Sequence, residues 1–119
     1  MTHDTDGLRL AARDTIMVIA GTSGTSAWHL RPGQSLTADL GLDDTGLAIL
    51  AGYQQRIAER LRHGPLACAI DPEAFREAQV WQVFSATLAC AGFAMLHEAA
   101  IRTVMQDAQD ALRAGAPGN

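Results

Sequence analysis

The sequence predicts an all-α protein. Apolar residues recur at helical spacing in several segments, no segment shows the alternating pattern of a strand, and residues typical of helix starts and ends separate the segments. The 119 residues suit one domain with a single modest core. The chain is 48% hydrophobic and 18% charged, as globular proteins commonly are.

The first predicted helix covers Gly7 to Ala20. Its buried stripe consists of Leu8, Ala12, Ile16 and Ile19. The polar residues 1–6 are expected to form a flexible tail. Gly21 is expected to end the helix, because glycine readily adopts the left-handed conformation of a helix cap.

A long loop should follow, since residues 21–34 are rich in Gly, Ser, Thr and Pro. Trp28 and Leu30 are expected to hold this loop against the core. A second helix should start at Asp43 or Asp44, where a carboxylate can cap it. It should end at His63-Gly64-Pro65, with glycine as the cap. Its buried stripe would be Leu47, Leu50, Ile57 and Leu61.

Two further helical segments are predicted before residue 92. Asp71-Pro72 is a strong helix start and predicts a short helix through Glu77. The next apolar stripe consists of Val80, Val83, Phe84, Thr87 and Leu88, and Gly92 interrupts it.

Residues 93–119 predict a C-terminal helical extension that ends in a loose tail. Its apolar stripe consists of Ile101, Val104, Met105, Ala108, Ala111 and Leu112. This stripe must be buried, either on the chain's own bundle or against a second copy or another protein. The intramolecular arrangement is favoured because added core helps a small domain. A homodimer through this helix is the other expectation.

Composition excludes several functions. The net charge of −4 argues against nucleic acid as a partner, and the absence of lysine excludes a P-loop. The polar N-terminus is not a signal peptide, and the apolar stretch from Ser85 to Met95 is too short to span a membrane. A cytoplasmic location is therefore expected.

The four histidines are isolated in sequence and predict no metal site. Cys68 and Cys90 are expected to be buried thiols.

Ser35 to Asp44 read Ser-Leu-Thr-Ala-Asp-Leu-Gly-Leu-Asp-Asp. This segment resembles the signature of acyl carrier proteins, in which Asp-Leu-Gly-Leu-Asp-Ser precedes the second helix. The order of predicted helices is also similar over roughly residues 7–91. The resemblance implies an acyl-carrier-like four-helix bundle over residues 7–92, followed by the extension.

One departure bears on function. The family's serine carries a phosphopantetheine arm, and Asp44 stands at that position. A carboxylate cannot be the hydroxyl nucleophile that accepts the arm, so no cofactor is expected. Thr45 has a hydroxyl and is the fallback acceptor, although it lies about 100° around the helix. Asp44 would instead supply a constant negative charge at the helix start.

The resemblance also implies a docking surface. The family's second helix is typically acidic, whereas this one carries three arginines. We expect either a solvated face or a surface that has lost the usual enzyme partners and gained an acidic one. The expected partner-binding residues are Asp43, Asp44, Leu47, Arg56, Arg60 and Arg62.

The predicted function is that of a non-catalytic accessory or adaptor protein without an arm, which docks on enzymes of fatty-acid, polyketide or related biosynthesis. Two alternatives stay open. One is a true acyl carrier, modified at Thr45 or altered at position 44. The other is an unrelated helical interaction module whose match to the signature is accidental.

Overall fold

The computed structural model describes residues 3–66 (side chains from residue 7), 69–93 and 97–114. These ranges form helices and contain no strand, so the all-α prediction is confirmed. The α-helices are α1 (His3–Ser23), α2 (Asp44–Arg62), α3 (Val80–Cys90) and α4 (Glu98–Ala114). The 3₁₀ helices are η1 (Ala27–His29) and η2 (Pro72–Phe75).

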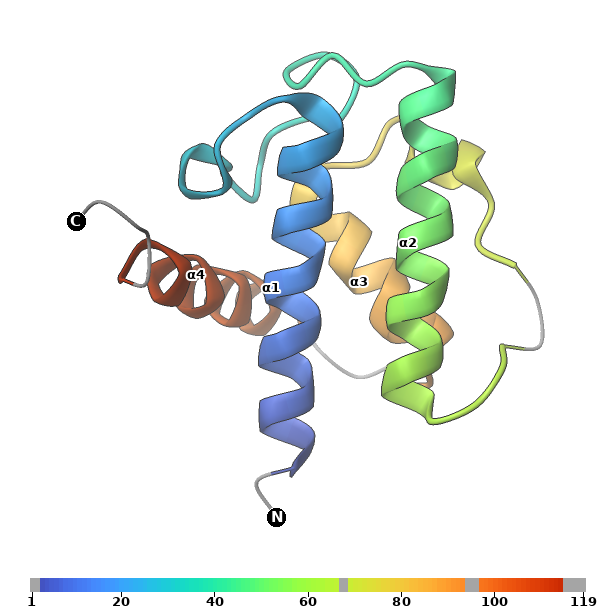
Figure 1. Cartoon of the computed structure of the whole chain (residues 1–119), viewed down its shortest axis with the longest axis vertical. Helices are drawn as coiled ribbons and strands as arrows, with labels where there is room; N and C mark the ends of the chain where they lie inside the picture. The colour runs from blue at the N-terminus through green and yellow to red at the C-terminus, as the bar shows by residue number, and fades with distance from the viewer. Residues whose placement is uncertain (1–2, 67–68, 94–96, 115–119) are drawn as a thin grey trace.

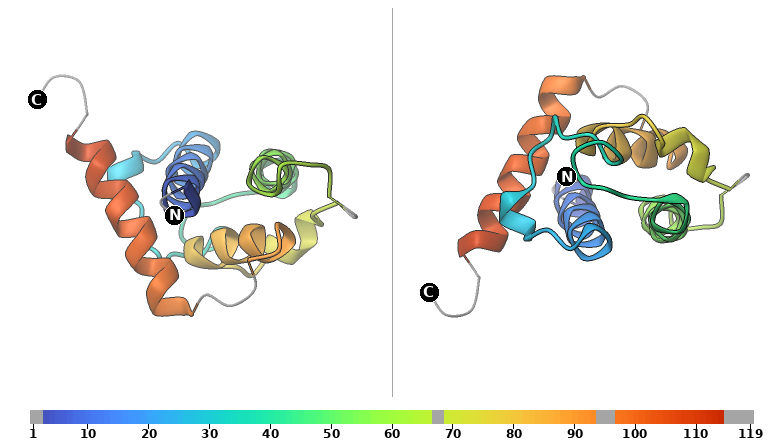
Figure 2. Two further views of the ribbon diagram at one scale, coloured as in Figure 1. Left: turned by 90° about the horizontal axis from the view of Figure 1, so that it is seen from below. Right: turned by 90° about the horizontal axis from the view of Figure 1, so that it is seen from above.

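The helices form two layers. In Figure 1, α1 and α2 lie side by side and run in opposite directions, with α3 behind them. Figure 2 shows that α3 and η2 cover one side of the α1–α2 pair, while α4 lies obliquely against α1, on the side away from α2. The order of α1, α2, η2 and α3 follows the predicted order of segments.

The bounds of α1 differ from the prediction at both ends. The helix includes His3, so residues 3–6 are helical and only residues 1–2 of the expected tail lie outside the described residues. It also continues through Gly21, which is therefore not its cap. Gly24 has the left-handed conformation, with φ 77°, and its N–H donates to the carbonyl of Ala20. Glycine ends a helix only where it adopts that conformation.

The bounds of α2 are close to those predicted. Asp43 is the N-cap, and its Oδ1 accepts a 2.8 Å hydrogen bond from the N–H of Gly46. At the other end the left-handed residue is His63, with φ 62°, rather than Gly64. The prediction of a glycine cap was wrong here, although the helix ends where expected.

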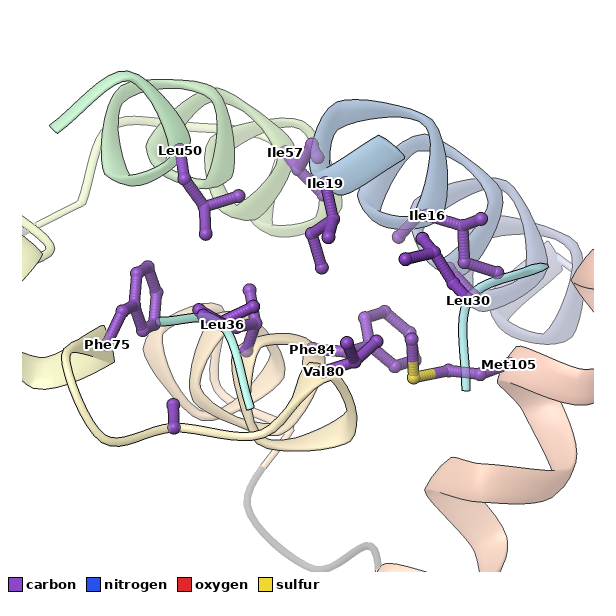
Figure 3. Packing of buried hydrophobic residues seen from close by; sticks show 14 of the residues in the cluster. Ile16, Ile19, Leu30, Leu36, Leu50, Ile57, Phe75, Val80, Phe84 and Met105 are labelled. Atoms are coloured by element: carbon purple, nitrogen blue, oxygen red, sulfur yellow. The ribbon is translucent and has the colours of Figure 1, made fainter. Parts of the chain in front are cut away.

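The core lies between the two layers, where side chains from the loop after α1 join those of the helices (Figure 3). Leu30 is 4% exposed, and Leu36 is completely buried. Trp28 is 38% exposed, so its expected role in holding the loop was wrong. Leu30 performs that role.

The polar group at the centre of this core is the amide of Gln54 on α2. Its Nε2 donates hydrogen bonds of 3.0 Å to Thr15 Oγ1 on α1 and of 2.8 Å to Thr87 Oγ1 on α3. All three side chains are fully buried. The Oε1 atom of Gln54 has no partner within the described residues. This cluster connects three helices at one level of the bundle.

Most of the apolar stripe of α4 packs on the chain's own bundle, whereas Ala111 is exposed, contrary to the prediction. Ile101, Met105 and Ala108 are at most 3% exposed and belong to the same cluster as the residues of α1 and α3. Nε2 of Gln109 donates to the carbonyls of Ala27 and Leu30. The intramolecular alternative is therefore the one found, and the stripe that suggested a dimer through this helix is already covered.

Candidate functional site

The residues that resemble the carrier signature have local structural roles. Leu36 and Leu42 are buried, and the N–H of Leu42 donates to the carbonyl of Leu36. Gly41 has φ 73°, a conformation that side chains other than glycine rarely adopt. Asp43 then caps α2. These residues form a compact turn that directs the chain into α2.

Asp44 is the first residue of α2, as predicted. Its side chain is 83% exposed, and Oδ1 accepts a 2.6 Å hydrogen bond from Nη2 of Arg76. The same nitrogen donates to Oε1 of Glu73 at 2.6 Å. Asp44 therefore does place a carboxylate at the helix start, where it shares the positive charge of Arg76 with Glu73.

The guanidinium of Arg76 lies between the carboxylates of Asp44 and Glu73, and this arrangement shifts the pKa values of Glu73 and Arg76. Hydrogen bonds from Arg76 hold the pKa of Glu73 below its usual value. The hydrogen bond to Glu73, followed by the one to Asp44, raises the pKa of Arg76. Arg76 is therefore charged at every pH at which the protein would be studied.

An open groove of about 730 Å³ lies next to Asp44, between α1 and α2. Met17 forms its rim on α1, whereas Ile49 and Tyr53 form its rim on α2, and these side chains are 46–51% exposed. The groove is lined by Met17, Val18, Gly21, Thr22, Asp43, Thr45, Gly46, Ile49 and Tyr53. It is an apolar surface with polar groups at the end where α2 begins.

Two glycines, Gly21 on α1 and Gly46 on α2, line the groove. A Cβ on Gly46 would lie 3.1 Å from a methyl group of Leu42 and 3.5 Å from the methyl group of Thr22. A Cβ on Gly21 would meet nothing within 4 Å. Gly46 therefore leaves room for the buried side chain of Leu42, while Gly21 leaves open space on α1.

A basic surface lies beyond the other end of the groove. Nη1 of Arg60 is 3.2 Å from Oδ2 of Asp14, and Nη2 of Arg13 is 3.6 Å from Oδ1 of the same carboxylate. Arg56 and Arg62 are also exposed. Two of these arginines thus share one carboxylate, which leaves excess positive charge here.

The expected partner-binding residues do not form one cluster. Asp44 and Arg56 are separated by about 18 Å along α2, at 1.5 Å per residue. Leu47 is 1% exposed and belongs to the core, so its expected contact with a partner was wrong. The surface instead has an acidic end, an apolar middle and a basic end.

Other predicted features concern metals, cysteines and membranes. Within the described ranges, no group of three His, Cys, Asp or Glu residues could hold a metal ion. His29, His63 and His97 are exposed. Cys90 is exposed and not buried as predicted, while Cys68 lies outside the described residues. No described helix is both long and apolar enough to cross a bilayer.

Sequence reasoning missed the groove and Arg76. Met17, Ile49 and Tyr53 are large apolar residues that stand off the buried stripes of their helices, and this signal could have identified them. The pairing of Arg76 with Glu73 follows from their spacing of three residues. Its contact with Asp44 depends on tertiary packing.

Comparisons with family models, with curated proteins and with solved structures found no match to this chain.

Proposed function

We propose that this protein is a non-catalytic, acyl-carrier-like docking protein that has no phosphopantetheine arm. The observation that carries the proposal is the carboxylate of Asp44 at the first position of α2, where the carrier signature has its serine. A carboxylate paired with Arg76 at 2.6 Å is not a hydroxyl nucleophile. What such a protein retains is a surface that other proteins can bind.

Two features support the carrier-like part of the proposal. The chain has a long first helix, a turn with the signature residues, a second helix, a short 3₁₀ helix and a further helix in the family's order. The signature residues also stand directly before α2, with Gly41 in the turn and Asp43 as the cap. Biosynthetic enzymes, of fatty-acid, polyketide or related pathways, are the partners that this resemblance suggests.

The arm is tested by mass. The chain is co-expressed with a phosphopantetheinyl transferase, and the intact mass is measured for wild type, Asp44→Ser and Asp44→Ala. We expect an unmodified wild type and Asp44→Ala variant, and an added phosphopantetheine mass on Asp44→Ser. That pattern would support two parts of the proposal: that the wild-type chain carries no arm, and that Asp44 stands at the position of the family's serine.

Two other outcomes would each overturn part of the proposal. Modification of the wild-type chain at Thr45 would make it a true carrier, an alternative supported by the exposure of this residue beside the groove. An Asp44→Ser variant that stays folded and unmodified would contradict the carrier-like assignment. The chain would then be an unrelated helical interaction module.

Docking is tested with enzymes encoded beside this chain's own gene. Their binding is measured by calorimetry for wild type, Arg62→Gln and Arg102→Gln. Arg62 is exposed and belongs to the predicted docking surface, whereas Arg102 lies on α4 and contacts Glu98 and Trp81. We expect Arg62→Gln alone to weaken binding. Equal loss in both variants, or no binding by any of these enzymes, would contradict the adaptor role.

A further inference from the structure

The outer side of the α1–α2 pair is not covered by any element that the structure describes (Figure 2). Among the described residues, five large hydrophobic side chains are exposed, and four of them belong to α1 and α2. Leu10 and Met17 lie two turns apart on α1, while Ile49 and Tyr53 lie one turn apart on α2. We call this surface, with the groove at its centre, the α1–α2 face.

Charge is distributed unevenly along the α1–α2 face. Asp43 is exposed and lines the groove at the end where α2 begins. Arg13, Arg56 and Arg60 lie beyond the other end, with Asp14 as the carboxylate that contacts two of them. The face is therefore negative at one end, apolar in the middle and positive at the other.

We infer that a second copy of this chain covers the α1–α2 face. The two copies would be related by a two-fold axis that runs through the centre of the interface, perpendicular to the helices. Each α2 then runs antiparallel to the α2 of the second copy, and the acidic end of each copy meets the basic end of the other. Such an interface is self-complementary, as a closed symmetric dimer requires.

The spacing along α2 fits this symmetry. Ala51 is the midpoint between Ile49 and Tyr53, so an axis at its level places Ile49 of one copy opposite Tyr53 of the other. From Ala51, Asp43 lies about 12 Å towards one end and Arg60 about 13.5 Å towards the other, at 1.5 Å per residue. Thr45 and Arg56 lie about 9 Å and about 7.5 Å from the same point. Opposite charges therefore meet at both ends when the apolar residues meet in the middle.

Other occupants match the face less completely. A parallel pairing of two copies would place Asp43 against Asp43 and Arg60 against Arg60, and like charges at an interface are unfavourable. A partner helix that is only acidic would match the basic end alone. Gly21 also leaves open space on α1, within the groove.

The pairing depends only on the α1–α2 face and not on the carrier-like assignment. Sedimentation equilibrium of the wild-type chain should therefore show a monomer–dimer equilibrium that depends on protein concentration. The dimer should dissociate more readily at high salt, because its charged ends are screened. A wild-type chain that stays monomeric over the whole accessible concentration range would overturn the inference.

A charge-swap experiment tests the register. Thr45→Arg places a cation opposite Arg56 of the second copy, and Arg56→Glu places a carboxylate opposite the acidic end. Each variant alone should have a dimer dissociation constant raised by about tenfold or more. An equimolar mixture of the two should recover the affinity of wild type, because the introduced arginine of one variant then faces the introduced glutamate of the other across the interface.

Thr103→Arg is the matched control. Thr103 is an exposed threonine on α4, outside the α1–α2 face, and gains the same charge. Its dimer affinity should equal that of wild type, and thermal melts of all variants should verify that they fold. Equal weakening by Thr45→Arg and Thr103→Arg, or a mixture that fails to recover, would show that any dimer uses another surface or register.

Discussion

The Nε2 atom of Gln109 on α4 lies 2.6 Å from the carbonyl oxygen of Leu30, in the loop that follows α1. The same nitrogen donates to the carbonyl of Ala27 at 2.8 Å, and Arg113 donates to the carbonyl of Trp28 at 3.0 Å. The C-terminal helix therefore holds a segment that lies 79 residues earlier in the chain.

Replacement of Gln109 should destabilise the protein. Gln109→Met keeps the size of the side chain but leaves the carbonyls of Ala27 and Leu30 without their donor, which should cost about 1–3 kcal/mol. Gln106→Met is the control, because Gln106 is exposed and its amide donates to Asp110 on its own helix. Urea unfolding of both variants measures the difference. Equal effects would contradict the role of Gln109.

Removal of α4 should abolish cooperative unfolding. Truncation after Gly92 deletes Ile101, Met105 and Ala108 from the core, which exposes the apolar surface that they cover. The milder variant Ile101→Ala should cost about 2–5 kcal/mol, whereas Thr103→Ala, at an exposed position, should change stability little. Thermal unfolding followed by circular dichroism tests this. A truncated chain with an unchanged transition would show that α4 is not part of the core.

The buried amide of Gln54 should not be needed for stability, because the hydroxyl groups that it contacts keep their own hydrogen bonds without it. Thr15 Oγ1 donates to the carbonyl of Ala11, and Thr87 Oγ1 donates to that of Val83. Gln54→Met keeps these bonds and removes the unpartnered Oε1, so stability should be unchanged or higher.

Thr15→Val removes an acceptor of the Gln54 amide and should cost about 1–3 kcal/mol. That cost should disappear in the Gln54→Met background, because no amide is left unpaired there. A double-mutant cycle measured by urea unfolding gives the coupling. Additive effects would show that the hydrogen bond between Gln54 and Thr15 contributes nothing.

The cap of α2 should depend on an oxygen at position 43 rather than on charge. Asp43→Ala removes the acceptor of the Gly46 N–H and should cost about 1 kcal/mol. Asp43→Asn keeps an oxygen in place and should cost much less. Thermal melts of the two variants at low and at high salt separate the two contributions, because salt screens only the charge effect. Equal losses at low salt that disappear at high salt would assign the effect to charge.

The cluster around Arg76 should give a pH dependence of defined sign. Because the pKa of Glu73 is lowered in the folded protein, its contribution to stability is present above the carboxyl's ordinary pKa and is lost as the pH falls through the lowered value. Arg76→Gln should lower Tm at neutral pH, and its difference from wild type should shrink in acid. NMR titration of Glu73 checks the pKa directly. A gap that widens in acid would contradict this assignment.

The sequence by itself determined the order of the helical segments and the bounds of α2, whereas both ends of α1 differ and the helix predicted through Glu77 is a 3₁₀ helix that ends at Phe75. Helical spacing of apolar residues identified the buried stripe of α3 completely, because each position contacts the core through its own helix face. Asp43 and Asp71 marked two helix starts, since capping is a local interaction between a side chain and the next backbone amides. Such local interactions can be predicted without knowing which segments pack against the helix.

The tertiary structure decided the features that depend on which segments meet. Gly21 was predicted as the cap of α1, and the structure shows that Gly24 adopts the left-handed conformation instead. Arg76 contacts Asp44, and Leu47 is buried in the core. Neither fact could be predicted from sequence, because each depends on which segments pack together. The groove is lined by residues of both α1 and α2, which only the packing of the two helices brings together. Periodicity identifies the faces of a helix, but only packing determines which face stays uncovered.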